Sequence, residues 1–224
     1  MIGTPRVHRR RVGSTNELAR TLAGAGAPHG TLVTAGEQTA GRGRQGRPWT
    51  APPGSAVLMS VVLRDLRETL PLAAAVAVSE ALPLSSRIKW PNDIWIDSRK
   101  VAGILVEGRP QEGWAVLGVG LNVRTTEFPG DLRHTATSLR LAGADVGVEE
   151  MMDALVASLG HWLTRSSEEV LSAWRERDAL RGRRVRWAGG EGEAAGVDGG
   201  GALLVETTAG VVALDAGEVH LTDP

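Results

Sequence analysis

The segment that most constrains the fold is residues 56–63, in which every residue except Ser60 is apolar. A strand with one wet face alternates apolar and polar residues, and this segment does not alternate. The segment therefore predicts a strand that is buried on both faces. A sheet that contains such a strand must be covered by other elements on both of its sides.

The chain offers several further strands for that sheet. Strands are expected at residues 30–35, 93–97, 100–107 and 114–123. The last three follow one another closely, with a tight turn at Asp97-Ser98-Arg99, and this pattern predicts an antiparallel meander. Within the second of these strands, alternation with a period of two places one set of residues on a common face: Lys100, Ala102, Ile104 and Val106.

Helical patterns alternate with the strands. Helices are expected from Ser14 until Gly24 and over residues 70–82, 148–163 and 167–180. The first should begin with a capping box, in which Ser14 caps the helix and Glu17 reaches back to it. Together the elements predict an α+β fold, in which helices pack on a mixed or antiparallel sheet.

The pattern changes after Leu180. Short strands are expected at residues 183–188, 193–197, 202–207 and 211–214, separated by glycine-rich turns. This arrangement predicts a small β-barrel of about 40 residues, which is too small to be very stable alone. We expect two domains, residues 1–180 and residues 181–224.

Composition limits the classes of function. The formal net charge of −1 argues against a protein that coats nucleic acid, which requires a strongly basic surface. The absence of cysteine excludes disulfides, thiolate metal sites and thiol catalysis, and it suits a reducing cytoplasm. The five histidines show no metal-binding spacing, so no protein metal site is expected. The basic residues 1–11 are expected to form a short solvated tail, and the longest apolar run, residues 70–78, is too short to span a bilayer.

A loop rich in arginine and glycine follows the first predicted strand. Between Gln38 and Trp49 it carries three arginines, Arg42, Arg44 and Arg47, and three glycines, Gly41, Gly43 and Gly46. Guanidinium groups offer fork-like donors to carboxylate and phosphate oxygens, and glycine lets backbone N–H groups come close. The loop is therefore suited to bind a compact polyanion.

The two lysines are placed unusually. Among 25 lysines and arginines only Lys89 and Lys100 are lysines, and they lie eleven positions apart in one block. Lysine is a compact charge with rotatable donors and does not replace arginine freely. The pattern indicates a need for ammonium groups there, and the alternative is codon bias combined with chance.

These motifs, in this order, resemble those of the biotin–protein ligases. The matching pieces are Ser14-Thr15-Asn16, residues 38–47 with Trp49, residues 89–93, residues 100–105 and residues 118–122. The resemblance covers essentially the whole chain and implies a catalytic domain like that of class II synthetases, followed by a small SH3-like β-barrel. Because the match begins by residue 14, we expect no N-terminal helix-turn-helix and no repressor role.

The resemblance implies a reaction in two halves. The carboxylate of biotin attacks the α-phosphate of ATP to give biotinyl-5′-AMP, and a lysine of a biotin carboxyl carrier protein domain then displaces AMP. Mg²⁺ on the phosphates would share the neutralisation of charge. The expected partner is the carrier domain, with no nucleic acid and no membrane, and the chain is expected to be a cytoplasmic monomer or weak homodimer.

The resemblance also implies roles for individual residues. The expected catalytic residues are Arg42, Arg44, Asp93 and Lys100. The expected biotin-binding residues are Ser14, Thr15, Asn16, Gln38, Gly41, Arg42, Gly43, Arg44, Lys100 and Gly103. The expected nucleotide-binding residues are Arg44, Arg47, Trp49, Lys89, Asn92 and Asn122.

Structural roles stay open for some of these residues. A plain helix cap explains Ser14 about as well as ligand binding does. Asn92 and Asp93 fit an Asx-type turn, and Asn122 fits a cap at the end of a strand. We further expect the loop around Gly43 to be mobile when empty and to close over the adenylate, because a mixed anhydride must be shielded from water.

Three rival functions remain at this point. A lipoate–protein ligase would share the catalytic fold and the adenylation chemistry, but the arginine-rich loop looks like the biotin branch. A nucleic-acid-binding module would use the loop and the basic N-terminus, but the overall charge is slightly acidic and no aromatic platform is visible. An inactive regulator would not be expected to retain the lysines and arginines.

Overall fold

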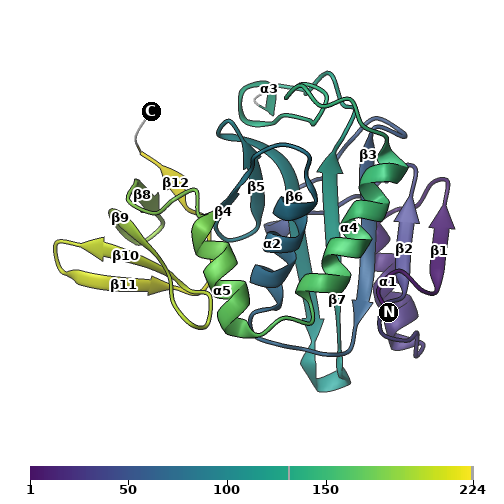
Figure 1. The fold of residues 1–224 in the computed structure, drawn as a ribbon, viewed down its shortest axis with the longest axis horizontal. Helices are drawn as coiled ribbons and strands as arrows, with labels where there is room; N and C mark the ends of the chain where they lie inside the picture. Colours follow the sequence, from purple (N-terminus) through teal and green to yellow (C-terminus); the bar gives the residue numbers. More distant parts are fainter. Residues whose placement is uncertain (131, 223–224) are drawn as a thin grey trace.

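The computed structural model describes residues 1–130 and 132–222, and its main feature is a seven-stranded sheet (Figure 1). The strand order is β1-β2-β3-β7-β6-β5-β4. The strands are β1 Arg6–Arg9, β2 Leu32–Ala35, β3 Ala56–Leu63, β4 Arg87–Lys89, β5 Asp93–Ile96, β6 Arg99–Arg109 and β7 Trp114–Asn122. The first pair is parallel and all other neighbours are antiparallel, so the sheet is mixed.

Strand β3 lies inside the sheet and all eight of its residues are buried, as its unbroken apolar sequence predicts. It pairs with β7 without interruption, from Ala56 opposite Asn122 to Leu63 opposite Ala115. Strands β5, β6 and β7 form the predicted meander. The turn between β5 and β6 uses left-handed backbone at Asp97 and Ser98, with φ of 48° and 60°.

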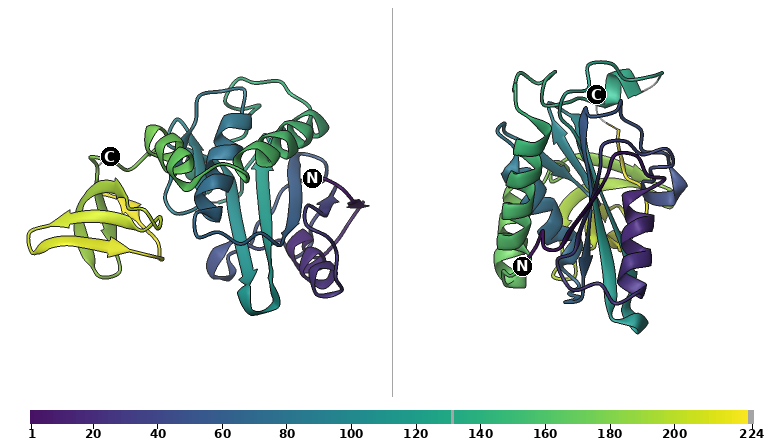
Figure 2. Two further views of the ribbon diagram at one scale, coloured as in Figure 1. Left: turned by 60° about the horizontal axis from the view of Figure 1, so that its bottom comes forward. Right: turned by 90° about the vertical axis from the view of Figure 1, so that its right-hand side faces the viewer.

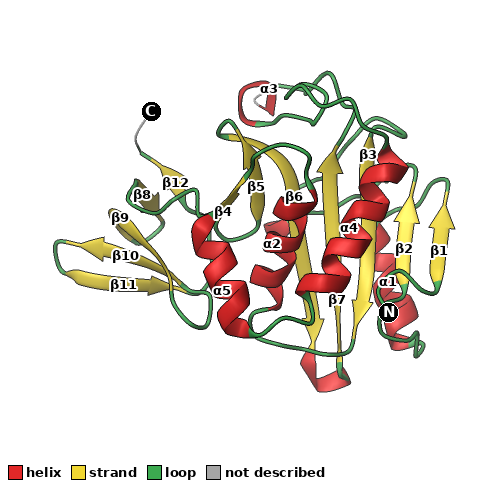
Figure 3. Ribbon diagram, viewed as in Figure 1, coloured by secondary structure: helices red, strands yellow, loops and turns green. Residues whose placement is uncertain are grey.

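Helices cover both faces of the sheet, as the end-on view in Figure 2 shows. The helices are α1 Thr15–Gly24, α2 Leu70–Ala81, α3 Leu132–Thr135, α4 Val148–Trp162 and α5 Ser167–Glu176. Helices α2 and α4 pack on one face and on each other, whereas α1 packs on the opposite face against β3 and β7. The sheet is therefore buried on two sides, and the mixed α+β fold is confirmed (Figure 3).

The C-terminal residues form a second sheet beside the first (Figures 1 and 2). Its order is β11-β10-β9-β8-β12. Its strands are β8 Arg184–Trp187, β9 Gly190–Val197, β10 Leu203–Thr207, β11 Gly210–Leu214 and β12 His220–Leu221. Up to residue 222, no pairing joins the outer strands β11 and β12, so the sheet is open. The predicted closed barrel is therefore not confirmed.

The second sheet packs on the first through shared apolar and polar contacts. Val185, Val205 and Val219 are fully buried in the same apolar cluster as the core of the large sheet. The indole of Trp90, which follows β4, donates a 3.0 Å hydrogen bond to the carbonyl of Gly201, between β9 and β10 of the second sheet. The position of the second sheet thus depends on the residue after β4 as well as on apolar packing.

Several expected boundaries are wrong for identifiable reasons. Ser14 precedes α1, but its side chain makes no capping hydrogen bond, and Glu17 instead pairs with Arg42 at 3.3 Å. Helix α5 ends at Glu176 rather than at residue 180. The backbone that follows it pairs with Ile88, whose N–H donates to Arg177 and whose carbonyl accepts from Ala179.

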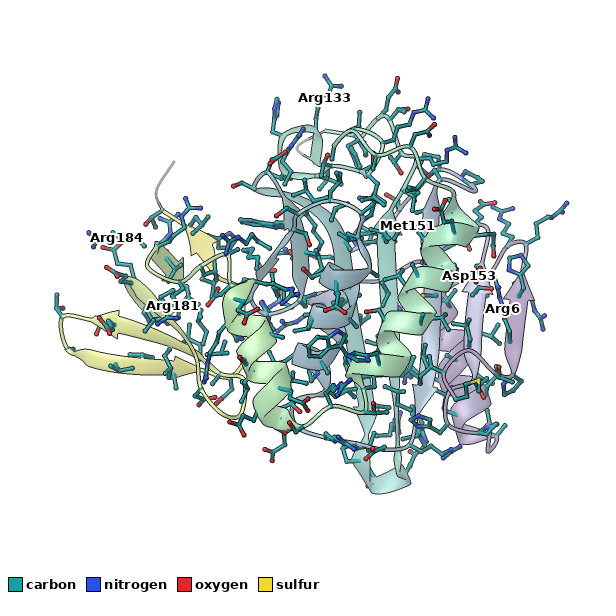
Figure 4. The ribbon with its side chains drawn as sticks, in the orientation of Figure 1. Arg6, Arg133, Met151, Asp153, Arg181 and Arg184 are labelled. Carbon is teal, nitrogen blue, oxygen red and sulfur yellow. The ribbon has the colours of Figure 1, made fainter. Side chains whose placement is uncertain are left out.

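The N-terminal arm is not a solvated tail. Residues Arg6–Arg9 form β1, which pairs in parallel with β2 at the edge of the large sheet. Val7 packs against the small apolar cluster under α1, and Arg6, labelled in Figure 4, forms a 3.0 Å ion pair with Glu149 of α4. The sequence did not predict this strand, because arginines surround the one apolar side chain that anchors it, Val7.

A helix that crosses a bilayer is long and almost entirely apolar. None of the helices in the described part of the chain is both long enough and apolar enough to do so.

The link between Trp90 and the second sheet can be measured. Trp90→Phe should lower the free energy of unfolding by about 1 kcal/mol more than Trp174→Phe, because only the first change removes a hydrogen bond and leaves a carbonyl unpaired. Trp174 is an equally buried control, since its indole N–H has no partner within the described residues. Urea unfolding of both variants checks this, and equal losses would contradict it.

Candidate active site

A cleft with a volume of about 510 Å³ opens on the sheet face that carries α1. It is bounded by the start of α1, the arginine-rich loop, strands β4 to β7, Phe128, residues 132–136 and residues 217–221. A cleft of this size matches those that hold cofactors and substrates of several hundred daltons. It is therefore the natural place for a ligand in this fold.

A β-bulge turns Lys100 toward the cleft. Strand β6 pairs with β5 through Ala102 opposite Ile94 and Lys100 opposite Trp95, so Val101 is an extra residue between the two pairs. An extra residue reverses the face on which the following side chains lie. The prediction that Lys100 shares a face with Ala102 is therefore wrong: Ala102 packs in the core, and Lys100 lines the cleft.

Three strand glycines make room for the side chains of the site. A Cβ on Gly118 would overlap the amide of Asn16, and a Cβ on Gly120 would overlap the indole of Trp49. A Cβ on Gly103 would lie 3.2 Å from both Lys100 and Trp49. The floor of the cleft leaves no room for a side chain at Gly118 and Gly120, and at Gly103 a side chain would fit only if Lys100 and Trp49 shifted.

Positive charge gathers over this floor. The ammonium of Lys100 lies 2.6 Å from a carboxylate oxygen of Asp93 and 5.7 Å from the ring centre of Trp49. The ammonium of Lys89 lies 5.5 Å from the ring centre of Trp95. Arg44 also lines the cleft and has no ion-pair partner within the described part of the chain. These cations outnumber the carboxylates beside them, so the site favours an anionic ligand.

Lys89 is held in an environment that opposes its charge. Burial lowers the pKa of Lys89 below its usual value of 10.5, and the charges of Lys100 and Arg47 lower the pKa further. The carboxylates of Asp93 and Glu218 act in the opposite direction without cancelling the effect. An anion bound beside Lys89 would therefore relieve an existing electrostatic cost.

The arginine-rich loop forms a small hairpin over the cleft. The N–H of Gly43 donates to the carbonyl of Arg47 at 2.7 Å, and the N–H of Trp49 donates to the carbonyl of Gly41 at 2.9 Å. Gln45 has left-handed backbone at its tip, with φ of 55°. Side chains tie the hairpin to both ends of the protein, because Arg42 pairs with Glu17 of α1 and Arg47 pairs with Glu218 near the C-terminus.

A cluster of neutral polar side chains forms another part of the cleft. The side-chain oxygen of Gln38 accepts from the backbone N–H of Thr15 at 2.7 Å and from its hydroxyl at 3.0 Å. The hydroxyl of Ser60 lies 2.8 Å from that of Thr15 and 2.6 Å from the side-chain oxygen of Asn16. Such a cluster suits an uncharged head group with several hydrogen-bonding atoms.

Nearly all predicted site residues line this one cleft. Those that do are Ser14, Thr15, Asn16, Gln38, Arg42, Gly43, Arg44, Arg47, Trp49, Lys89, Asn92, Asp93, Lys100, Gly103 and Asn122. Gly41 does not line it; Gly41 is buried, and a Cβ there would overlap the carbonyl of Trp49. It serves the packing of the hairpin.

Two of the asparagines that line the cleft donate hydrogen bonds to backbone carbonyls. The amide of Asn92 donates to the carbonyl of Ile104 at 2.8 Å, and the amide of Asn122 donates to the carbonyl of Thr137 at 3.1 Å. Both bonds reach backbone 12 and 15 residues further along the chain, so neither is the local turn or cap that the sequence offered as an alternative.

Two lining segments escaped the prediction from sequence. Residues 128–136 contribute Phe128 and Leu132, and a backbone bridge between Ala136 and Lys100 holds this segment beside β6. The C-terminal segment contributes Glu218 and His220. No local pattern marks either segment, because tertiary contacts alone bring them to the cleft.

The environment of Lys89 leads to a prediction about stability. Lys89→Met should raise the melting temperature at neutral pH by about 2 °C, because it removes a charge that burial disfavours. With a lowered pKa, the folded chain binds fewer protons than the unfolded chain between that pKa and 10.5. Wild-type stability therefore rises with pH across this window, and the advantage of the variant disappears.

Melting curves of wild type and variant from pH 7 to pH 10.5 check this prediction. Arg133→Met is the control, since Arg133 is an exposed cation on α3 that points outward in Figure 4. A Lys89→Met variant that melts below wild type at pH 7 would contradict the account.

Comparison with known proteins agrees with this geometry. Residues 9–123 match the biotin/lipoate A/B protein ligase family. The chain is 37% identical to the bifunctional ligase/repressor BirA of Bacillus subtilis, over 93% of this chain and 71% of that protein. It is 34% identical to the biotin–[acetyl-CoA-carboxylase] ligase of Mycobacterium tuberculosis, over 93% of this chain and 86% of that protein.

Solved structures show the same similarity. The biotin protein ligase of Aquifex aeolicus, determined in complex with biotin and ATP, superposes with a TM-score of 0.85 at 27% sequence identity. The match covers 99% of this chain and 100% of that protein. The family match spans more than half of the chain, and both sequence relatives exceed 30% identity over most of their length. The chain therefore belongs to the biotin/lipoate A/B protein ligase family, among the biotin–protein ligases.

Proposed function

We propose that the chain activates biotin as biotinyl-5′-AMP with ATP and transfers the biotinyl group to a lysine of a biotin carboxyl carrier protein domain. The observation that carries this proposal is that one cleft combines a cationic part with a cluster of neutral hydrogen-bonding groups. The cationic part suits a carboxylate and a polyphosphate, and the neutral cluster suits the uncharged ureido ring of biotin. The relatives named above support the same assignment.

In the first half-reaction an oxygen of the biotin carboxylate bonds to the α-phosphorus of ATP. The bond from that phosphorus to the bridging oxygen breaks, and pyrophosphate leaves with the electron pair. Both reactants are anions, so their approach requires cations that hold them in line. Lys100 and Arg44 are placed to do this: the bulge fixes Lys100, and Arg44 has no ion pair with any residue that the structure describes.

In the second half-reaction the neutral amine of the carrier lysine attacks the acyl carbon. An amide bond forms, the bond from the acyl carbon to the phosphate oxygen breaks, AMP leaves with the electron pair, and the nitrogen gives up one proton to solvent. Asp93 orients this amine, because its carboxylate lines the cleft beside Lys100 and remains 19% exposed. Lys100 lies 2.6 Å from one carboxylate oxygen of Asp93, and the other oxygen can accept a hydrogen bond from the amine.

Mg²⁺ fits this site as an ion carried by the phosphates. It binds commonly through one or two carboxylates together with substrate phosphates, and Asp93 and Glu218 are carboxylates that line the cleft. Bound there, the ion would neutralise charge on the phosphates. Within the described residues no three histidine, aspartate or glutamate side chains gather into a metal site of the protein alone.

We also propose the finer organisation of the chain. Residues 1–180 are the catalytic domain, related to the class II synthetase fold, and residues 181–224 are a variant of the SH3-like barrel that is open on one side. Arg47 and Glu218 connect the two parts across the cleft. The protein acts in the cytoplasm as a monomer or weak homodimer, with the carrier domain as its macromolecular partner.

Formation of biotinyl-AMP tests the proposed function. Purified chain with biotin, ATP and Mg²⁺ should form the adenylate, and lipoate should not replace biotin. Arg44→Ala and Lys100→Ala should each slow adenylate formation by about 10²-fold or more, because each removes a cation that faces developing negative charge. Arg140→Ala, which removes an exposed arginine outside the cleft, should retain full activity.

The outcomes separate the rival functions. Adenylate from lipoate alone would assign the chain to the lipoate branch. Absence of adenylate from both acids would overturn the ligase assignment. Full activity in Arg44→Ala and Lys100→Ala would keep the ligase but remove these residues from its site.

The hairpin over the cleft should respond to ligand. Trypsin cleavage after Arg44 should slow at least severalfold when biotin and ATP are both present, because closure over the adenylate buries the tip at Gln45. Cleavage after Arg181, which is exposed and lies outside the cleft, serves as the internal control. Equal cleavage of the hairpin with and without substrates would show that it does not close.

A further inference from the structure

A half-buried glutamate on β6 lies directly behind the neutral polar cluster. One oxygen of Glu107 accepts from the side-chain N–H of Asn16 at 2.8 Å, and the other accepts from Arg20 of α1 at 3.3 Å. Glu107 does not line the cleft, whereas Asn16 does. Glu107 can therefore act on a ligand only through Asn16.

This contact fixes the orientation of the Asn16 amide. Because the nitrogen of the amide faces Glu107, its oxygen faces the hydroxyl of Ser60, 2.6 Å away. The amide is packed so closely on the backbone of Gly118 that no Cβ fits there. Asn16 is 6% exposed and Ser60 is 0% exposed, so water has little access to this corner.

The orientation of the Gln38 amide, at the other end of the cluster, is also fixed by a hydrogen bond. Gln38 presents its oxygen to Thr15, because the backbone N–H of Thr15 donates to that oxygen at 2.7 Å. A backbone N–H cannot become an acceptor, so Gln38 cannot gain by exchanging its oxygen and nitrogen. Both ends of the cluster are therefore hydrogen-bond acceptors.

The cluster is one hydrogen-bond donor short. Three oxygen–oxygen contacts run from Asn16 through Ser60 and Thr15 to Gln38, with lengths of 2.6, 2.8 and 3.0 Å. Each hydroxyl carries a single proton, so two protons serve three contacts. One contact always brings two lone pairs together, and in a dry corner this arrangement is unfavourable.

A ligand with an N–H group resolves the shortage. An N–H that donates to the oxygen of Asn16 or Gln38 satisfies that acceptor, so the neighbouring hydroxyl can donate to the contact between Ser60 and Thr15 instead. The contact left without a proton then involves an oxygen that the ligand already serves, and it can lengthen at little cost. A ligand that brings only acceptors or apolar atoms leaves the cluster as it was. The cluster therefore selects a head group with N–H donors, as a ureido ring has.

We propose that Glu107 is a positioning residue for this selection: by holding the nitrogen of Asn16, it keeps the cluster one donor short and makes binding depend on a ligand N–H. Without Glu107 the Asn16 amide turns over and donates to Ser60. Three donors then serve three contacts, and the cluster is complete before any ligand arrives. The inference rests on the proposed function, in which the ligand is biotin.

The experiment compares biotin with its two cyclic carbamate analogues, in each of which a ring oxygen replaces one ureido N–H. Affinities are measured by calorimetry on the full chain without ATP or carrier. In wild type, at least one analogue should bind about 100-fold more weakly than biotin, because a buried acceptor loses its donor. In Glu107→Ala this penalty should fall to about 10-fold or less, and biotin itself should bind about 10-fold more weakly.

Two control variants separate this role from charge and stability. Arg20→Ala breaks the same ion pair from the other side but leaves the bond from Asn16 to Glu107, so it should keep the wild-type penalty within threefold. Glu149→Ala removes a different ion pair with an arginine, far from the cluster, and should also keep it. Melting curves confirm that all variants are folded.

The outcomes are decisive for Glu107. Penalties in Glu107→Ala and wild type that agree within threefold would overturn the inference. So would an equal fall in Arg20→Ala, because the ion pair and not the Asn16 amide would then be responsible. A wild-type chain that binds no biotin would contradict the proposed function instead, and this result is distinct because it precedes any variant.

Discussion

The uninterrupted pairing of β3 with β7 is the interaction on which the rest of the structure depends. Eight consecutive residue pairs hold these strands together in the interior of the sheet. One face of the pair supports α4, on which α2 packs, and the other supports α1 and the floor of the cleft. A shift of register by one residue would exchange these faces and would carry Ser60 and Gly118 away from Asn16.

The cleft is built from features that oppose stability. Lys89 is charged where burial disfavours charge, the polar cluster lacks a donor, and Gly118 and Gly120 give up side chains within a strand. The two glycines make room for Asn16 and Trp49, whereas the first two features become favourable only when a ligand supplies an anion or an N–H group. The site therefore favours ligands that supply the missing negative charge and the missing N–H donor, and such local instability is common at functional sites.

The sequence predicted the elements whose pattern is local. The apolar run of β3, the meander and most helices follow from periodicity, and the motifs placed fifteen predicted residues in one cleft. Periodicity failed at Lys100, because a bulge is set by the pairing of two strands and not by one. It failed at β1 and at Glu218, whose positions depend on partners far along the chain. Ser60 was visible as the one polar residue in an apolar run, but its contacts with Asn16 and Thr15 were not.

Lys89 and Trp90 are adjacent in the chain and serve different parts of the molecule. Lys89 faces the cleft, while the indole of Trp90 reaches the second sheet at Gly201. Any force that separates the second sheet from the first is therefore transmitted within one residue to a side chain of the site. The two parts are therefore joined next to the site, so a displacement of the second sheet would act on the residue beside Lys89.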